Sequence, residues 1–167
     1  FPIRGLYIDA LERANDHAFI TSAYFIPDRE IFASLVDAAK RGVKVKVLVP
    51  KRSNHVVADW ISRAYYDDLI SAGIEIWQYE HAMIHAKTAT VDGRWSTVGT
   101  ANIDRLSMFG NYEINVQTWS EEHAAEMEKI FENDLSTSSQ LREEEWRARS
   151  MITRGVEQLL KPLGVLM

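Results

Sequence analysis

The chain has 167 residues, of which 46% are apolar, and this composition fits one domain with a full hydrophobic core. It has no cysteine, which excludes disulfides and thiolate sites. The net charge of -5 disfavours a general nucleic-acid binder, which normally carries a basic face. No run approaches the roughly 20 apolar residues that span a bilayer, and no signal-peptide pattern is present. Because the chain opens on Phe1-Pro2, we expect it to be a piece of a longer protein.

Helical and strand-like patterns alternate over the first part of the chain. The expected helices are 4–15, 28–41 and 55–72, and the expected strands are 18–23, 43–49 and 74–79. This order predicts right-handed parallel crossovers. A hairpin of strands 84–91 and 96–101, a strand 111–119 and a helix 121–135 follow. We therefore predict an α/β fold with a mixed, mostly parallel sheet and helices on both faces.

The last part of the chain is expected to be an extension. Residues 136–140 form a polar break, so we divide the chain into a main domain, 1–140, and an amphipathic helical extension, 141–167. The extension mixes basic and apolar residues and fits a helix that lies in the lipid interface. It fits equally a helix packed on the domain or on a partner half.

Polar residues interrupt the hairpin in a pattern that packing does not explain. His85 and Lys87 share one face of the expected strand, because side chains alternate along a strand. A neighbouring ammonium favours the neutral, nucleophilic form of an imidazole. Lys87 offers a charge to a phosphate oxygen, and Thr100 and Asn102 offer neutral donors. Together these residues can bind a phosphoryl group for attack by a histidine nitrogen.

Glu113 is a candidate to orient the histidine. It lies on the next expected strand and could accept a hydrogen bond from the second imidazole nitrogen. Metal chemistry is disfavoured, since the lysine beside His85 would repel a cation and the ligand spacing of zinc or magnesium sites is missing. We therefore expect neither a metal nor another cofactor.

The spacing of these residues resembles a known signature. His85-x-Lys87, Asp92 and Gly99-Thr100-x-Asn102 resemble the HxKxxxxDxxxxxxGSxN (HKD) motif of the phospholipase D superfamily, with threonine in place of the serine. Surrounding segments, which include residues 24–28, 41–50 and 99–105, resemble the C-terminal catalytic half of bacterial cardiolipin synthases. The resemblance runs from about Gly5 to the end of the chain.

The resemblance implies an activity and partners. The implied reaction transfers a phosphatidyl group from one phosphatidylglycerol to another through a phosphohistidine and releases glycerol. It implies a second HKD half, from a missing N-terminal part or a homodimer, and a peripheral place on an anionic cell-membrane surface, facing the cytoplasm. The alternatives are a phosphodiesterase of the same superfamily, either a phospholipase or a nuclease, and a non-catalytic half that binds lipid or a partner.

Further candidates surround the motif. Tyr24 at the end of the first strand, His55 at a helix start and Tyr65 in that helix are candidates for substrate binding, although aromatic residues with a polar tip also serve as core. Asp92 belongs to the catalytic pattern, while its place in the hairpin turn indicates a structural part. Asp104 and Arg105 are expected to form an ion pair near the pocket floor.

Overall fold

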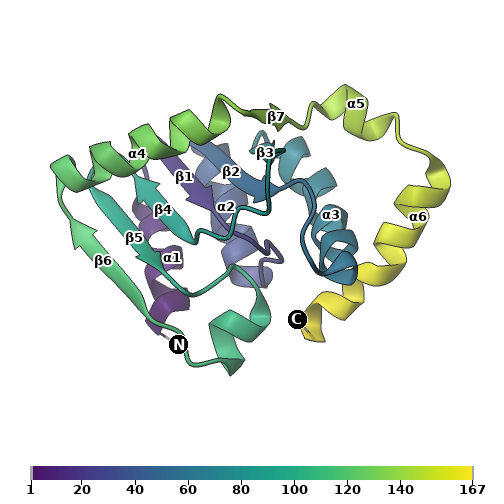
Figure 1. Cartoon of the computed structure of the whole chain (residues 1–167), viewed down its shortest axis with the longest axis horizontal. Coiled ribbons are helices and arrows are strands. Elements are labelled where there is room, and N and C mark those ends of the chain that lie inside the picture. The colour runs from purple at the N-terminus through teal and green to yellow at the C-terminus, as the bar shows by residue number, and fades with distance from the viewer. Residues whose placement is uncertain (1, 167) are drawn as a thin grey trace.

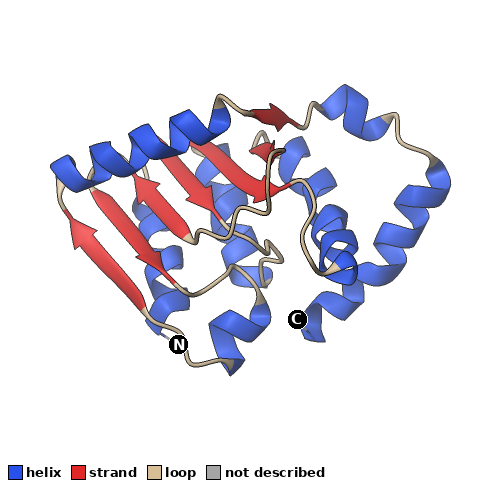
Figure 2. Ribbon diagram, in the orientation of Figure 1, coloured by secondary structure: helices blue, strands red, loops and turns tan. Residues whose placement is uncertain are grey.

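The computed structural model describes residues 2–166, which form a seven-stranded sheet with helices on both faces (Figure 1, Figure 2). The strand order is β6-β5-β4-β1-β2-β3-β7. The strands are β1 His17–Thr21, β2 Lys44–Pro50, β3 Glu75–Tyr79, β4 Thr88–Val91, β5 Trp95–Gly99, β6 Asn115–Trp119 and β7 Ser138–Gln140. The helices are α1 Pro2–Arg13, α2 Arg29–Lys40, α3 Val56–Ser71, α4 Glu121–Leu135, α5 Glu143–Arg147 and α6 Met151–Leu160, with a π-helical turn, η1 Leu106–Gly110, and a 3₁₀ turn, η2 Lys161–Leu166.

The mixed sheet confirms the predicted fold class, but the sheet is not mostly parallel. Among the pairings between strands of residues 2–166, β1–β2 and β2–β3 are parallel and the other four are antiparallel. The parallel part comes from the crossovers through α2 and α3, as expected. The hairpin β4–β5 joins β1 with opposite direction, and β6 and β7 are antiparallel edge strands.

The main core lies between the sheet and helices α1, α2 and α3. Alternate residues of β2 (Val45, Val47 and Val49) face these helices, as period-two strands with one apolar face require. Asp28 caps α2, because its carboxylate accepts from the backbone N–H groups of Glu30 and Ile31. Arg4 of α1 binds the same carboxylate at 2.7 and 3.0 Å, which ties the first two helices together.

Helix α4 covers the opposite face of the sheet (Figure 1). Its Phe131 stacks on Phe19 of β1 with ring centroids 5.0 Å apart. Lys46 of β2 is buried under the same helix and binds Glu132 at 2.8 Å. This lysine therefore secures α4 to the sheet and does not lie at a solvated strand end.

His17 adds a pH-dependent contact between β1 and α4. Its Nδ1 lies 2.8 Å from Asp16 and its Nε2 lies 2.7 Å from Glu128. Burial opposes the charged ring, but hydrogen bonds to the two carboxylates outweigh burial and raise the pKa of His17. The stabilisation is then complete below the unfolded pKa, near 6.5, and is lost as pH rises through the higher folded value.

We therefore expect His17→Gln to lower the free energy of unfolding at low pH and to have little effect once the pH exceeds the folded pKa of His17. Urea unfolding of both proteins at a series of pH values measures this difference. A difference between them that stays constant from pH 5 to pH 9 would contradict the assigned role.

The C-terminal segment packs against α3 and pairs with the sheet edge. Strand β7 pairs with β3, where the sequence predicted only a polar break. Beyond it, α5, α6 and η2 contact α3. Glu157 of α6 is only 2% exposed and binds Arg149 at 2.5 Å and Arg63 of α3 at 3.3 Å. The segment therefore packs on the domain, as one of its two interpretations predicted, and charged residues make part of this contact. None of the helices within residues 2–166 combines the length and apolar character needed to cross a bilayer.

Candidate active site

The polar cluster lies at one end of the sheet, where β1 and β2 end and β4 begins. Pairing between β1 and β4 stops at Thr21 and Thr88. The chain turns away after Thr21, so residues 84–87 have no β1 partner and do not belong to a strand, contrary to the prediction of strand 84–91. Lys87 still accepts a hydrogen bond from the backbone N–H of Gly99, which holds it beside β5.

His85 and Lys87 contact each other directly. The Lys87 Nζ lies 3.1 Å from His85 Nδ1 and donates to the His85 carbonyl oxygen at 2.6 Å. His85 is exposed, and its Nε2 has no hydrogen-bond partner within residues 2–166. Lys87 is 6% exposed, and burial lowers the pKa of its ammonium, although the carboxylates of Glu113 and Asp104 oppose that effect. The pair presents one free imidazole nitrogen beside a largely desolvated cation.

Thr100 and Glu113 form the next part of the cluster. The Thr100 hydroxyl donates to the Glu113 carboxylate and accepts from the backbone N–H of Ile114 at 3.0 Å. Glu113 lies just before β6, not on a strand, and its carboxylate binds Thr100 instead of the imidazole of His85. Gly99 permits this close approach, because a Cβ there would lie 2.3 Å from the Ile114 carbonyl oxygen.

Asn102 lies on the wall of a cavity of about 270 Å³, which Tyr24, His55 and Glu113 also line. Its side-chain oxygen is buried and has no hydrogen-bond partner within residues 2–166. A buried acceptor without a partner is costly unless a ligand or water satisfies it. The Tyr24 hydroxyl donates to Asn54, and the Tyr24 ring lies 5.7 Å from the ring of His55. The structure thus brings these predicted residues to one cavity.

Asp104 is a site residue that the sequence analysis misjudged. It lines the same cavity, is 9% exposed and accepts from the backbone N–H of Ser107 at 2.7 Å. Burial raises its pKa. Within residues 2–166 it has no ion pair with Arg105, whose guanidinium lies 5.0 Å from the centre of the Phe109 ring. The feature of the sequence that could have placed Asp104 at the cavity is its position two residues after Asn102.

Two other predicted residues lie away from the cluster. Asp92 forms the hairpin turn with φ of 53°, and its carboxylate accepts from the backbone N–H groups of residues 15–17 at 2.9 to 3.0 Å. The four residues of β4, roughly 13 Å of extended chain, separate it from the sheet end at which His85 lies, so Asp92 is not part of this cluster. Tyr65 lines a second cavity, on the other side of Ile26.

The arrangement can bind and stabilise an anionic, tetrahedral group. Lys87 supplies a cation, and the amide of Asn102 and the hydroxyl of Thr100 supply neutral hydrogen-bonding groups. An exposed imidazole nitrogen beside them can attack phosphorus or protonate a leaving oxygen. Within residues 2–166 no group of three or more histidine and carboxylate side chains is placed to hold a metal ion.

Comparison with known protein families shows to which family the chain belongs. Residues 7–135 match the family described as cardiolipin synthase, PLD-like domain. The chain belongs to this family. As a member of the PLD-like domain family, it carries the HKD residues His85, Lys87, Thr100 and Asn102 at the site described above.

Whole-chain relatives and solved structures agree with the match. The chain is 34% identical over 165 residues to cardiolipin synthase of Clostridium perfringens and 37% identical over 164 residues to that of Oceanobacillus iheyensis. These alignments cover 99% and 96% of the chain but 35% and 34% of the relatives, so the chain spans about a third of their length.

Two solved structures share the fold. The phospholipase D family member Nuc from Salmonella typhimurium superposes with a TM-score of 0.73 at 24% identity, covering 83% of this chain and 90% of Nuc. Phosphatidylserine synthase of Haemophilus influenzae gives 0.75 at 13% identity, covering 98% of this chain and 42% of that protein.

Proposed function

We propose that the chain is a phosphatidyltransferase half-domain, of residues 1–140 with extension 141–167, and that its complete protein makes cardiolipin from two phosphatidylglycerol molecules and releases glycerol. The observation that carries the proposal is the convergence of His85, Lys87, Thr100 and Asn102 at one sheet end in a member of this family. His85 is the only histidine of the chain with a lysine two residues later.

The proposed reaction is a double displacement on phosphorus. One imidazole nitrogen attacks the phosphorus of the donor lipid, a P–N bond forms, and the P–O bond to glycerol breaks while a second imidazolium protonates the leaving oxygen. A hydroxyl of the acceptor lipid then attacks the phosphorus and gives its proton to that second imidazole. The P–N bond breaks, and cardiolipin leaves. His85 supplies one of the two imidazoles.

The other residues of the site bind and position the reacting group. Lys87 and the amide N–H groups of Asn102 bind the phosphoryl oxygens, while the Thr100 hydroxyl donates its proton to Glu113 and holds this carboxylate in place. Tyr24 and His55 line the cavity that receives the head group. Asp92 acts at a distance, by holding the hairpin turn to the segment before β1.

Products distinguish this proposal from phosphodiester hydrolysis. The complete protein is incubated with phosphatidylglycerol, and the lipid products are separated by thin-layer chromatography. In a separate reaction it is incubated with supercoiled plasmid, and the DNA is separated by gel electrophoresis. We expect cardiolipin and glycerol and no nicked plasmid. Phosphatidic acid without cardiolipin would indicate a hydrolytic phospholipase, nicking would indicate a nuclease, and no reaction would indicate a non-catalytic half.

We also propose a peripheral position on an anionic membrane surface, with the site facing the cytoplasm. Helix α6 directs its charged residues toward α3, where Arg154 binds Asp67 and Lys161 of η2 binds Asp68. Four of its apolar residues point outward: Met151, Ile152, Val156 and Leu159 are 87%, 81%, 39% and 78% exposed, and Leu163 of η2 is 41% exposed. Leu160, in contrast, packs inward against the domain. An outward apolar stripe on a helix is typical of interfacial insertion.

We expect the double variant Ile152→Ser/Leu159→Ser to bind vesicles of phosphatidylglycerol at least tenfold more weakly, since each buried aliphatic side chain contributes roughly 1.5–3 kcal/mol. Flotation of the 167-residue chain measures binding. Ile130→Ser on α4, which removes another exposed isoleucine, is the matched control and should bind normally. Equal binding by the double variant would assign the stripe to a protein contact.

A further inference from the structure

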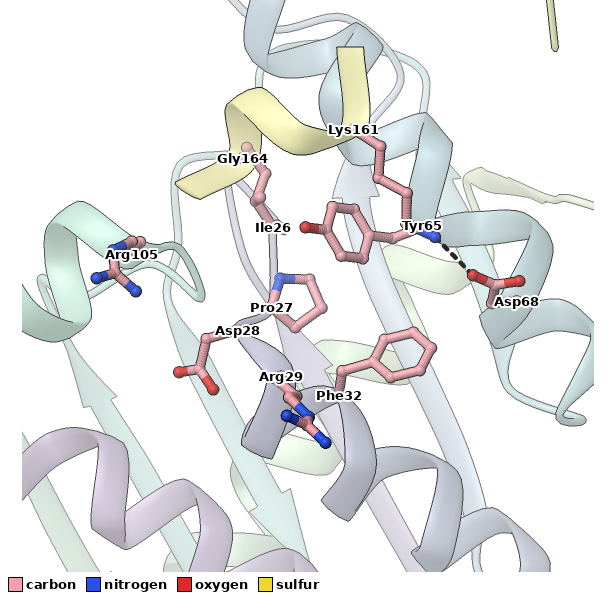
Figure 3. Close-up of a pocket in the computed structure, with 10 residues that line it drawn as sticks. All are labelled: Ile26, Pro27, Asp28, Arg29, Phe32, Tyr65, Asp68, Arg105, Lys161 and Gly164. Atoms are coloured by element: carbon pink, nitrogen blue, oxygen red, sulfur yellow. Dashed lines mark hydrogen bonds and ion pairs between the residues drawn. The ribbon is translucent and has the colours of Figure 1, made fainter. Parts of the chain in front are cut away.

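A second cavity, of about 330 Å³, adjoins the site and has no assigned role (Figure 3). Ile26, which is 2% exposed, lines both this cavity and the one at Asn102. Arg105 and Asp104 are consecutive residues, and Arg105 lines the second cavity whereas Asp104 lines the first. The two cavities therefore share a wall.

The apolar part of the second cavity comes from four elements or loops. Ile26 and Pro27 precede α2, Phe32 belongs to α2, Tyr65 belongs to α3, and η2 closes over them at Gly164. Figure 3 shows the rings of Phe32 and Tyr65 on one side of the cavity and Arg105 on the other. The Tyr65 hydroxyl points into the space between them, with no hydrogen-bond partner within residues 2–166.

Two guanidinium groups at the cavity lack a counter-charge. Neither Arg29 nor Arg105 has an ion pair within residues 2–166, and both are exposed. The carboxylates of the cavity, in contrast, are already paired. Burial opposes the charge of Asp28, but Arg4 and two backbone N–H groups bind it and lower its pKa. Asp68 binds Lys161 at 2.7 Å, as Figure 3 shows. Three cations and two carboxylates line the cavity, so its charged groups sum to a net charge of +1, and the two guanidinium groups are the unpaired ones.

This combination of apolar walls and free guanidinium groups fits an amphiphile with a phosphate. Arginine binds phosphate oxygens through two parallel N–H bonds, while rings and aliphatic side chains accept glycerol and acyl carbons. The turn η2, which closes the cavity at Gly164, also carries Leu163, which is 41% exposed.

We propose that this second cavity binds the acceptor phospholipid through its glycerophosphate, with Arg29 and Arg105 on the phosphate and Tyr65 as a further donor. The proposal rests on the transfer reaction proposed above. The acceptor's free glycerol hydroxyl then passes Ile26 into the first cavity, where it attacks the phosphorus held at His85. Binding of acceptor beside donor favours transfer over hydrolysis, because a bound alcohol competes with water by its effective concentration.

Binding is tested on the 167-residue chain with dihexanoyl-phosphatidylglycerol below its micelle concentration, by isothermal titration. Arg29→Gln/Arg105→Gln should weaken binding by at least tenfold, whereas Arg94→Gln, in the distant hairpin turn, should not. Dihexanoyl-phosphatidylcholine and glycerol 3-phosphate should bind more weakly than phosphatidylglycerol. Unchanged affinity of the double variant, or equally tight binding of glycerol 3-phosphate, would overturn the proposal.

A second measurement tests the role as acceptor site. In the complete protein, the double variant should shift the products from cardiolipin toward phosphatidic acid by about tenfold, with released glycerol as the internal reference. An unchanged product ratio would refute the role as acceptor site. Failure of the wild-type protein to form any cardiolipin would refute the proposed function, and the titration would still decide whether the cavity binds anionic lipid.

Discussion

Replacement of His85 by alanine is expected to lower turnover of phosphatidylglycerol by the complete protein by several orders of magnitude and to leave the fold intact. A histidine that forms or protonates a covalent intermediate has no substitute in the site. The fold should persist, because His85 is exposed and its ring has one hydrogen-bond partner within residues 2–166, the ammonium of Lys87. Initial rates of cardiolipin formation and thermal unfolding measure the two effects separately.

Variants of the neighbouring residues should lower the activity by different amounts. Lys87→Ala and Asn102→Ala should also be severe, since they remove direct contacts to the phosphoryl group. Glu113→Gln should be milder, because it perturbs the orientation of Thr100 and keeps both imidazoles. His123→Ala, at an exposed histidine in the first turn of α4, is the matched control and should keep full activity. More than a tenth of the wild-type rate in His85→Ala would rule out the assignment.

The second large effect concerns the number of histidines: a strictly monomeric preparation of the 167-residue chain should not turn over phosphatidylglycerol. In-line displacement puts the attacking group and the leaving group on opposite faces of phosphorus, so one imidazole cannot serve both. The chain has one His-x-Lys motif, and His17, His55, His81 and His123 each lack a lysine two residues later. The second imidazole must come from another half.

Sedimentation velocity combined with activity measures this dependence. If a symmetric dimer supplies the second imidazole, the rate should rise with the square of protein concentration in the range where monomers dominate. Mixing wild-type chain with the His85→Ala chain should then depress activity, because each mixed dimer has one histidine. Many turnovers by a preparation that sediments as a monomer would refute the requirement for two halves.

The turn and the crossovers could be predicted from local sequence. Asp92-Gly93 predicts the hairpin turn because both residues tolerate positive φ, and the structure has φ of 53° and 62° there. The proportion of parallel strands could not be predicted in this way. The direction of β4, β6 and β7 depends on which neighbour each strand meets, and β7 is a three-residue polar segment that only the edge of β3 makes into a strand.

The sequence predicted which residues form the site but not which of them bind to one another. Spacing identified His85, Lys87, Thr100 and Asn102, whereas the partner of Glu113 depends on where β6 begins, at Asn115 opposite Gly99. Helix periodicity could not separate Tyr65 from Tyr66, of which the second is buried and 4% exposed. Likewise, the mixture of basic and apolar residues in 141–167 left open whether the segment packs on the domain, and the ion pairs of Glu157 with Arg149 and Arg63 hold it there.

The most direct test of phosphatidyl transfer uses two phosphatidylglycerols whose acyl chains differ in mass. The complete protein is incubated with an equal mixture, and the lipid products and glycerol are quantified by mass spectrometry. Our account predicts cardiolipins that combine acyl chains of both substrates, with one glycerol released for each cardiolipin formed. Release of glycerol with phosphatidic acid as the sole lipid product would contradict it.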